Sequence, residues 1–290
     1  MKKIKLVFFS GTGGTAKAAT LLAKNLKDTG CKVETFALEA KRADTDLFDI
    51  GSIDMLVLLF PVHAFNAPVP VYRWLKKLPR GSKIPAAVIS VAAGGSHWIN
   101  TASRLEAIKL LTRKNYDVFY ERMLVMPMNM VVTSKPSFNR RILELLPQKT
   151  EGIAADLLAM KHRRILPLLK SRLLTLAGKA EIPWAKCFGK ELTVRKTCTG
   201  CGLCRCNCPM GNIEMKNSRP HFGWHCIACL RCIYACPSSS IYPRLSRFIV
   251  LKEGYDLEKM EKQIDIQEPD EAIATGAYLI FKEYLENRES

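Results

Sequence analysis

Short apolar runs alternate with amphipathic stretches along the first half of the chain. Runs rich in β-branched and aromatic residues predict buried strands, and they lie at residues 4–9, 32–36, 53–60, 86–92 and 116–126. Between them, apolar side chains at helical spacing predict helices at 68–77, 98–114 and 139–160. Another helix follows residue 15, with one apolar stripe formed by Ala16, Ala19, Leu22, Ala23 and Leu26. Regular alternation of this kind predicts an α/β fold, a doubly wound parallel sheet of five strands covered on both faces.

Three loops that follow predicted strands carry candidate binding residues. Ligands of a parallel sheet bind beyond the carboxyl ends of its strands. The first loop has small and hydroxyl side chains and opens a helix, which predicts an anion site built from backbone N–H groups. The other two offer flat rings and glycines that allow close backbone approach. The candidate cofactor-binding residues are Ser10, Gly11, Thr12, Gly13, Gly14 and Thr15; Pro61, Val62, His63, Ala64, Phe65 and Asn66; and Ala92, Ala93, Gly94, Gly95, His97 and Trp98.

The first loop fits two kinds of cofactor. Gly11-x-Gly13-x-x-Ala16 satisfies a relaxed dinucleotide fingerprint, with Glu34 about where a ribose-binding acid belongs. A hydroxyl-rich loop without positive charge suits the terminal phosphate of FMN better than a bridging pyrophosphate, so we favour FMN and keep NAD as the alternative. For His63 and His97, packing or hydrogen bonding within the loop is the simpler interpretation, and proton relay to a flavin is the alternative.

Eight of the eleven cysteines occupy two runs with the same spacing, C-x2-C-x2-C-x3-C-P. A bacterial-type ferredoxin holds two [4Fe–4S] clusters with this spacing, and the fourth cysteine of each run binds the other cluster. Two structural zinc sites are the alternative, but zinc gives no reason for a third cysteine at the same short step. The predicted ligands are Cys198, Cys201, Cys204 and Cys236 for one cluster, and Cys226, Cys229, Cys232 and Cys208 for the other.

Three cysteines lie outside this register. We interpret Cys31, Cys187 and Cys206 as packed, unreactive thiols, and the alternatives for Cys206 are an alternative ligand or a redox-sensitive group. Cysteine usage of this kind fits a reducing compartment. No apolar stretch reaches the length of a membrane span, and the N-terminal apolar run is too short for a signal peptide. The sequence therefore predicts a cytoplasmic protein without a membrane span.

Charge is distributed unevenly along the second half. Residues 161–196 carry ten basic and two acidic side chains, a net charge of +8, whereas residues 252–290 carry five basic and eleven acidic ones, a net charge of −6. No recognised nucleic-acid module or interleaved aromatic residues accompany the basic segment, so nucleic acid is not a predicted partner. We expect an acidic redox partner protein, or the acidic tail of the chain itself, to face it.

The first loop, Phe9-Ser10-Gly11-Thr12-Gly13-Gly14-Thr15, resembles the FMN phosphate loop of flavodoxins, [ST]-x-T-G-N-T, with Gly14 in place of the usual Asn. With the doubled cysteine runs downstream, residues 1–245 resemble the flavodoxin–ferredoxin fusion proteins. The resemblance implies a flavodoxin-like sheet, a small α+β bacterial ferredoxin-like domain and a helical C-terminal tail. The expected divisions are a flavodoxin-like FMN-binding domain at 1–160, a basic helical linker at 161–187, a two-cluster ferredoxin domain at 188–243 and an acidic helical tail at 244–290.

The expected function is electron transfer between FMN, two [4Fe–4S] clusters and redox partner proteins, which needs no catalytic acid or base. The enzyme alternative is an FMN-dependent reductase of a small substrate, in which the clusters serve as an internal electron relay. A redox or iron sensor is a third possibility, for which Cys206 is the sequence hint. The sequence leaves the electron donor and acceptor open.

Overall fold

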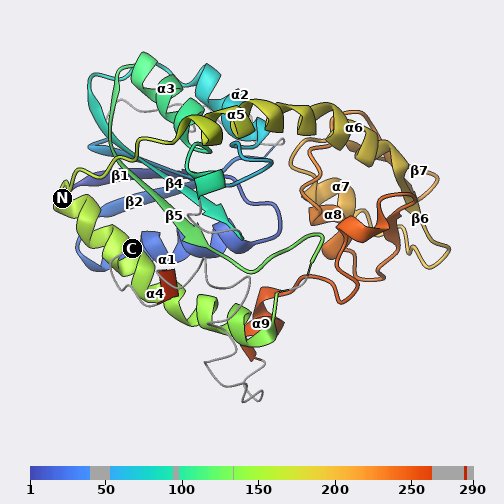
Figure 1. Ribbon diagram of the computed structural model, residues 1–290. Coiled ribbons are helices and arrows are strands. Elements are labelled where there is room, and N and C mark those ends of the chain that lie inside the picture. The colour runs from blue at the N-terminus through green and yellow to red at the C-terminus, as the bar shows by residue number, and fades with distance from the viewer. Residues whose placement is uncertain (40–52, 94–97, 133, 263–283, 286–290) are drawn as a thin grey trace.

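The computed structural model describes residues 1–39, 53–93, 98–132, 134–262 and 284–285. Its main feature is a parallel sheet in which the strand order is β2-β1-β3-β4-β5 (Figure 1). This is the flavodoxin-like order of doubly wound sheets, and it confirms the predicted fold class. The strands are β1 (Lys3–Phe8), β2 (Lys32–Ala37), β3 (Met55–Pro61), β4 (Ile84–Ala92) and β5 (Tyr116–Val125).

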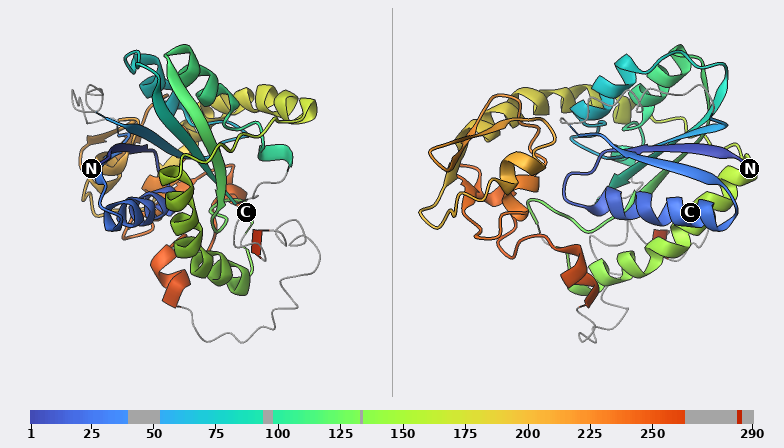
Figure 2. Two further views of the ribbon diagram at one scale, coloured as in Figure 1. Left: turned by 90° about the vertical axis from the view of Figure 1, so that its left-hand side faces the viewer. Right: turned by 180° about the vertical axis from the view of Figure 1, so that it is seen from behind.

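Helices cover both faces of the sheet (Figure 2). On one face, α1 (Gly14–Asp28) and α4 (Pro136–Leu158) bury one set of strand side chains, while α2 (Val69–Lys77) and α3 (Leu105–Arg113) bury the opposite set. Because both faces are covered, the central strand β3 is apolar throughout rather than alternating. The predicted apolar stripe on α1 differs from the buried one at two residues. Ala18 is buried although it was not predicted to be, and Ala16, which was predicted, is only half-buried.

The predicted helix at 98–114 is interrupted. A short 3-10 helix, η2 (Trp98–Asn100), is followed by a turn, and α3 begins only at Leu105. The turn brings Arg104, which is 1% exposed, to the buried Glu121 of β5, with 2.9 Å between Arg104 Nε and Glu121 Oε2. Apolar periodicity carries no information about such a buried ion pair, which is why the sequence predicted one continuous helix.

The basic linker is helical only in its second part. Residues 161–168 run beside β5, where Arg163 and Tyr120 form a parallel bridge, and the helices are α5 (Leu169–Ala177), η3 (Gly178–Ala180) and α6 (Glu181–Glu191). Pro167 explains the late start, because the residue before a proline disfavours helical backbone. Helices α5 and α6 then lead from the α2 side of the sheet to the cysteine region (Figure 1).

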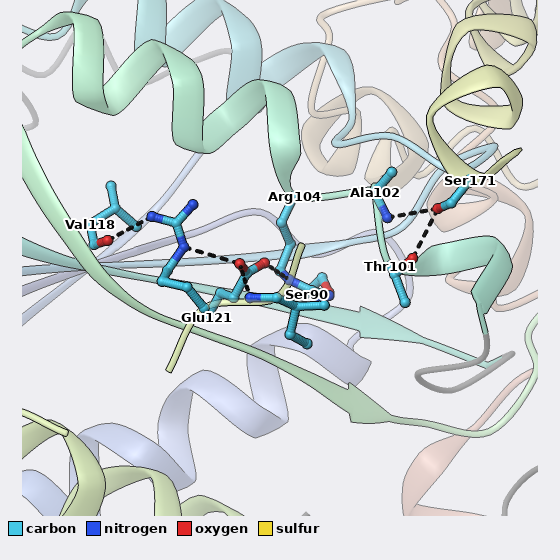
Figure 3. A network of polar contacts seen from close by, with 9 residues as sticks. Ser90, Thr101, Ala102, Arg104, Val118, Glu121 and Ser171 are labelled. Atoms are coloured by element: carbon cyan, nitrogen blue, oxygen red, sulfur yellow. Dashed lines mark hydrogen bonds and ion pairs between the residues drawn. The ribbon is translucent and has the colours of Figure 1, made fainter. Parts of the chain in front are cut away.

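A polar network attaches the start of the linker to the sheet (Figure 3). Glu121 accepts hydrogen bonds from Arg104 Nε at 2.9 Å, Arg164 Nε at 3.1 Å and the Ile165 N–H at 2.9 Å. Further along, Ser171 Oγ accepts a hydrogen bond from the Ala102 N–H at 3.0 Å. Arg164 of the basic segment is therefore paired with a buried carboxylate of the sheet, which the sequence did not predict.

The cysteine region is small and mixed in structure. Its two antiparallel pairs are β6 (Leu192–Val194) with β9 (Ile241–Pro243), and β7 (Ile213–Lys216) with β8 (Arg219–Phe222). Short helices α7 (Leu203–Asn207) and α8 (Arg231–Tyr234) follow the cysteine loops, and Phe188, Leu192 and Ile241 form part of a separate apolar core. This arrangement confirms the predicted small α+β region after the sheet.

The described part of the tail packs away from the linker. A 3-10 turn, η4 (Arg247–Ile249), leads to α9 (Leu257–Lys262), where Glu261 pairs with Lys17 of α1 at 2.7 Å. Tyr284 Oη accepts a hydrogen bond from the Val125 N–H at 3.2 Å. These contacts lie on the α1 and α4 side, and most of the predicted tail helix lies outside the described residues. None of the described helices is both long and apolar enough to cross a membrane.

Candidate redox centre

The phosphate-loop prediction falls on the turn between β1 and α1. Ser10 Oγ accepts a hydrogen bond from the Ala16 N–H at 3.1 Å, and this bond closes the loop. Helix α1 begins at Gly14, so the N–H groups of Gly14 and Thr15 have no acceptor within the helix. Together with the positive end of the helix dipole, they are suited to an anion such as the FMN phosphate.

Asn129, to which the sequence gave no role, contacts the phosphate loop. Asn129, in the segment after β5, donates a hydrogen bond from Nδ2 to Thr12 Oγ1 at 2.8 Å. The Met-Pro-x-Asn sequence at 126–129 was the available signal, but nothing in it indicated contact with a loop 117 residues earlier.

The loop after β3 is a tight turn that is held by a hydrogen bond to helix α5. The His63 and Asn66 backbones pair with each other at 2.8 Å, and Asn66 Nδ2 donates to the Thr175 carbonyl of α5 at 2.8 Å. The His63 ring packs edge-on against Phe9, and burial lowers the pKa of His63 to about 4. His63 is therefore neutral at physiological pH, as expected of a packed loop histidine.

The loop after β4 is described only at its ends. The Val62 N–H donates to the Val91 carbonyl at 2.8 Å, so the loops after β3 and β4 start side by side. Ala92 ends β4, Ala93 follows it, and Trp98 begins η2. The candidates Gly94, Gly95 and His97 lie outside the described residues, so their contribution to a flavin site stays a prediction.

The cysteines fall into two neighbouring sets. We use "first set" for Cys198, Cys201, Cys204 and Cys236, and "second set" for Cys208, Cys226, Cys229 and Cys232. Cys208 comes from the first run but interacts electrostatically with the three second-run members of the second set. Conversely, Cys236 comes from the second run but interacts electrostatically with Cys204, which also interacts with Cys201. Among the residues that the structure describes, no three His, Cys, Asp or Glu side chains converge as tightly as ligands of a single metal ion do.

Backbone N–H groups point at several of these sulfurs. Cys208 Sγ accepts from the Asn212 N–H at 3.2 Å, Cys226 Sγ from Ala228 at 3.4 Å and Cys236 Sγ from Ser240 at 3.3 Å. Hydrogen bonds of this kind stabilise thiolates and tune the potential of an iron–sulfur cluster. The donor set and its hydrogen bonds therefore fit thiolate-ligated iron.

The two sets differ in burial. Burial raises the pKa of Cys226 to about 12 and also raises the pKa of Cys229 and of Cys232. In the first set, burial also raises the pKa of Cys204, but Cys201 is exposed. Helix α6 closes over the second set, where a Cβ at Gly189 would overlap Cys226 Cβ. Metal ions in contact with these thiolates would offset the cost of ionising them.

The second set lies directly against the phosphate loop. A Cβ at Gly11 would lie 3.1 Å from the Cys229 carbonyl oxygen, so only glycine allows this approach without displacement. Arg231 donates from Nε to the Gly11 carbonyl at 3.0 Å and from another guanidinium nitrogen to the Ser10 carbonyl. The same side chain pairs with Glu39 at 3.0 Å. Arg231 thus joins the two halves, although sequence spacing gave no sign of it.

A cavity of about 440 Å³ opens at this junction. It lies between the phosphate loop and helix α8, and its polar lining includes Ser10, Thr12, Glu39, Asn207, Arg231, Tyr234 and Tyr255.

The cysteines outside the register are less buried than expected. Cys31 is half-buried, but Cys187 and Cys206 are exposed, so the interpretation of these two as packed thiols is wrong. Cys206 lies on the short helix α7, which also carries Cys204 of the first set.

Comparisons with known proteins bear on each half of the chain. Residues 191–237 match the family model of the 4Fe-4S dicluster domain. A flavodoxin of Streptococcus pneumoniae TIGR4 is similar to the sheet region at 17% identity, with a TM-score of 0.40, over 54% of this chain and 98% of that chain. Flavodoxin 1 of Bacillus cereus covers 55% of this chain and 98% of its own at 14% identity, with a TM-score of 0.39.

Rubredoxin oxygen:oxidoreductase of Desulfovibrio gigas is similar over 55% of this chain but only 37% of its own length, at 19% identity and a TM-score of 0.40. A search of curated protein sequences finds no match.

Proposed function

Because the chain joins a flavodoxin-like sheet to a 4Fe–4S region, we propose that it is an electron-transfer protein that holds FMN and two [4Fe–4S] clusters. When bound, the flavin supplies two-electron chemistry and the clusters supply one-electron chemistry. The phosphate loop would bind FMN through the Gly14 and Thr15 N–H groups, and the two cysteine sets would each bind one cluster.

The contact between Gly11 and Cys229 is the observation that carries this proposal. It places a cysteine of the second set against the loop suited to a flavin phosphate, within one protein and without an intervening domain. Arg231 fixes the two loops relative to each other through the Ser10 and Gly11 carbonyls. These contacts support the proposal because they would hold the flavin and the cluster of the second set close to each other.

The difference in burial suggests which set serves a redox partner. The second set is covered by α6 and by the phosphate loop, whereas Cys201 of the first set is exposed. A partner protein could therefore approach the first set most closely. In this arrangement the second set would exchange electrons with the flavin, and the first set would exchange them with the partner.

Anaerobic reconstitution tests the cofactor assignment. The full chain should take up FMN and about eight iron and eight sulfide, the content of two cubane clusters. Binding of NAD without flavin, or of zinc in place of iron, would refute the proposal.

The role of the junction is tested by Arg231→Ala, with Arg219→Ala as the matched control. Arg219 is exposed on β8, away from the phosphate loop. We expect Arg231→Ala to slow cluster reduction after photoreduction of the flavin at least tenfold, with FMN and iron contents retained. Equal rates in the two variants would contradict a junction that Arg231 holds.

A further inference from the structure

A second cavity, of about 470 Å³, lies apart from the phosphate loop. It is enclosed by α2 and the loop before it, by η3 and α6, and by the segment that carries Cys226. Its volume falls in the range of sites for small organic molecules. Much of its wall is apolar and is formed by Pro68, Val69, Leu110, Ile182, Ala185, Met210 and Ile227.

The charged residues around this cavity are mostly cationic. Four exposed bases line it, against the two acids Glu106 and Glu181. The bases come from α2 and from the η3–α6 segment, so they approach the cavity from two sides, and they are Arg73, Lys76, Lys179 and Lys186. An apolar interior with a cationic rim suits an organic anion, because the body is desolvated while the charged group keeps a favourable potential.

Two further groups are available for hydrogen bonding. The hydroxyl of Tyr72 is buried near the Ala67 backbone but has no partner in hydrogen-bonding geometry among the residues that the structure describes. Glu181 lies 3.9 Å from His63 Nδ1, and burial raises the pKa of Glu181 to about 7. A buried hydroxyl without a partner is costly, and a ligand that accepts its hydrogen bond would remove that cost.

We propose that this cavity binds a small organic anion with an apolar ring, of the aromatic carboxylate class, against the wall that contains Cys226. The Arg73 and Lys76 side chains attract the carboxylate, and the Pro68, Ile182 and Ile227 side chains enclose the ring. The site does not include the phosphate loop, but His63 and Asn66 of the loop after β3 line part of it. Its ligand would lie beside the second cysteine set. Binding does not depend on the electron-transfer proposal.

Isothermal titration of the anaerobically reconstituted full chain tests this inference, with 2-naphthoate as the probe and neutral 2-naphthamide as its comparison. We expect 2-naphthoate to bind at least tenfold more tightly than the amide. Arg73→Glu combined with Lys76→Glu should weaken 2-naphthoate at least tenfold. Lys77→Glu combined with Arg80→Glu makes the same charge change at exposed residues outside the cavity wall and should alter affinity less than twofold.

A steric variant tests the location of the ring. Ile182→Trp should abolish 2-naphthoate binding, because Ile182 lines the cavity, whereas Leu176→Trp on the exposed face of α5 should not. Iron content and melting temperature establish whether each variant is folded. If Ile182→Trp does not fold, the comparison of the two double charge variants tests the proposal alone. Absence of 2-naphthoate binding at millimolar concentration, equal affinity for the amide, or equal loss in both charge pairs would overturn the proposal.

Discussion

Burial controls the charge of Glu181, and this has a measurable effect on stability. The carboxyl ionises near pH 4.5 in the unfolded chain and near pH 7 in the fold. Its folded pKa is raised, so the stability that the neutral form contributes is complete below about pH 4.5 and is lost as the pH rises through about 7.

Glu181→Gln removes this titration. We expect the variant to be more stable than the wild type by on the order of 2 kcal/mol at pH 8 and to differ much less at pH 5. Thermal unfolding at the two pH values measures the effect. Glu214→Gln is the control, since the Glu214 side chain is 76% exposed. A difference that does not change with pH would show that the carboxyl of Glu181 is not buried in this way.

Exchange of ligands between the two cysteine runs leads to a prediction for single substitutions. Cys208→Ala should remove about four of eight iron atoms, because one cubane loses a ligand, and the lost cluster should be the one held by the second set. Cys206→Ala is a matched control two residues away, at an exposed thiol outside the register. Iron analysis and the spectrum of the remaining reduced cluster distinguish the outcomes. Loss of the cluster of the first set alone would disprove the exchange.

Residue spacing predicted the cysteines and the phosphate loop, but it could not predict the residues that join them. The eight cysteines are recognisable because a cubane requires several ligands from one short loop. Arg231 and Asn129 act through contacts 221 and 117 residues away in the chain. Such contacts leave no local periodicity, so only the folded arrangement reveals them.

At the scale of the elements, the Glu121 network attaches the linker to β5. Glu121→Ala should lower the free energy of unfolding by about 3–5 kcal/mol, because it leaves the Arg104 guanidinium buried without its carboxylate. Arg164→Ala should cost about 1 kcal/mol, since the Arg164 side chain is 41% exposed and water can replace its partner. Urea unfolding of both variants gives the comparison. Equal losses would mean that the linker attachment, rather than the buried pair, dominates.

The order of strands and helices was predictable because short runs rich in apolar residues alternate with helices that carry an apolar stripe. The exceptions have physical causes in single residues. Pro167 delays the linker helix, and the pairing of Arg104 with Glu121 breaks the helix predicted at 98–114. The sequence predicted that an acidic partner protein or the acidic tail faces the basic linker, but in the described part of the tail α9 contacts α1, where Glu261 pairs with Lys17. Charge balance along a sequence therefore did not indicate which segments meet.

In the whole molecule, the pairing of basic linker residues within the fold changes where a partner is expected to dock. Arg164 is held by Glu121, so the basic segment 161–196 is not a uniform docking surface. Near the exposed Cys201, the bases Lys196 and Arg205 are exposed, and Leu203 is 45% exposed between them. Apolar contact surrounded by charge is typical of transient protein interfaces. We therefore expect a redox partner to bind around the first set.

Lys196→Glu combined with Arg205→Glu should slow electron transfer to an acidic bacterial ferredoxin about tenfold at low salt, because complementary charge mainly accelerates association. The wild-type rate should fall toward the variant's rate as salt shortens the Debye length. Arg172→Glu combined with Lys179→Glu, at exposed linker residues, makes the same charge change away from Cys201 and should leave the rate nearly unchanged.

Stopped-flow measurement of acceptor reduction, with FMN and iron contents matched, distinguishes the two surfaces. If the linker pair slows transfer as much as the pair near Cys201, the partner responds to the overall charge of the chain, and the first set has no special role as the outlet.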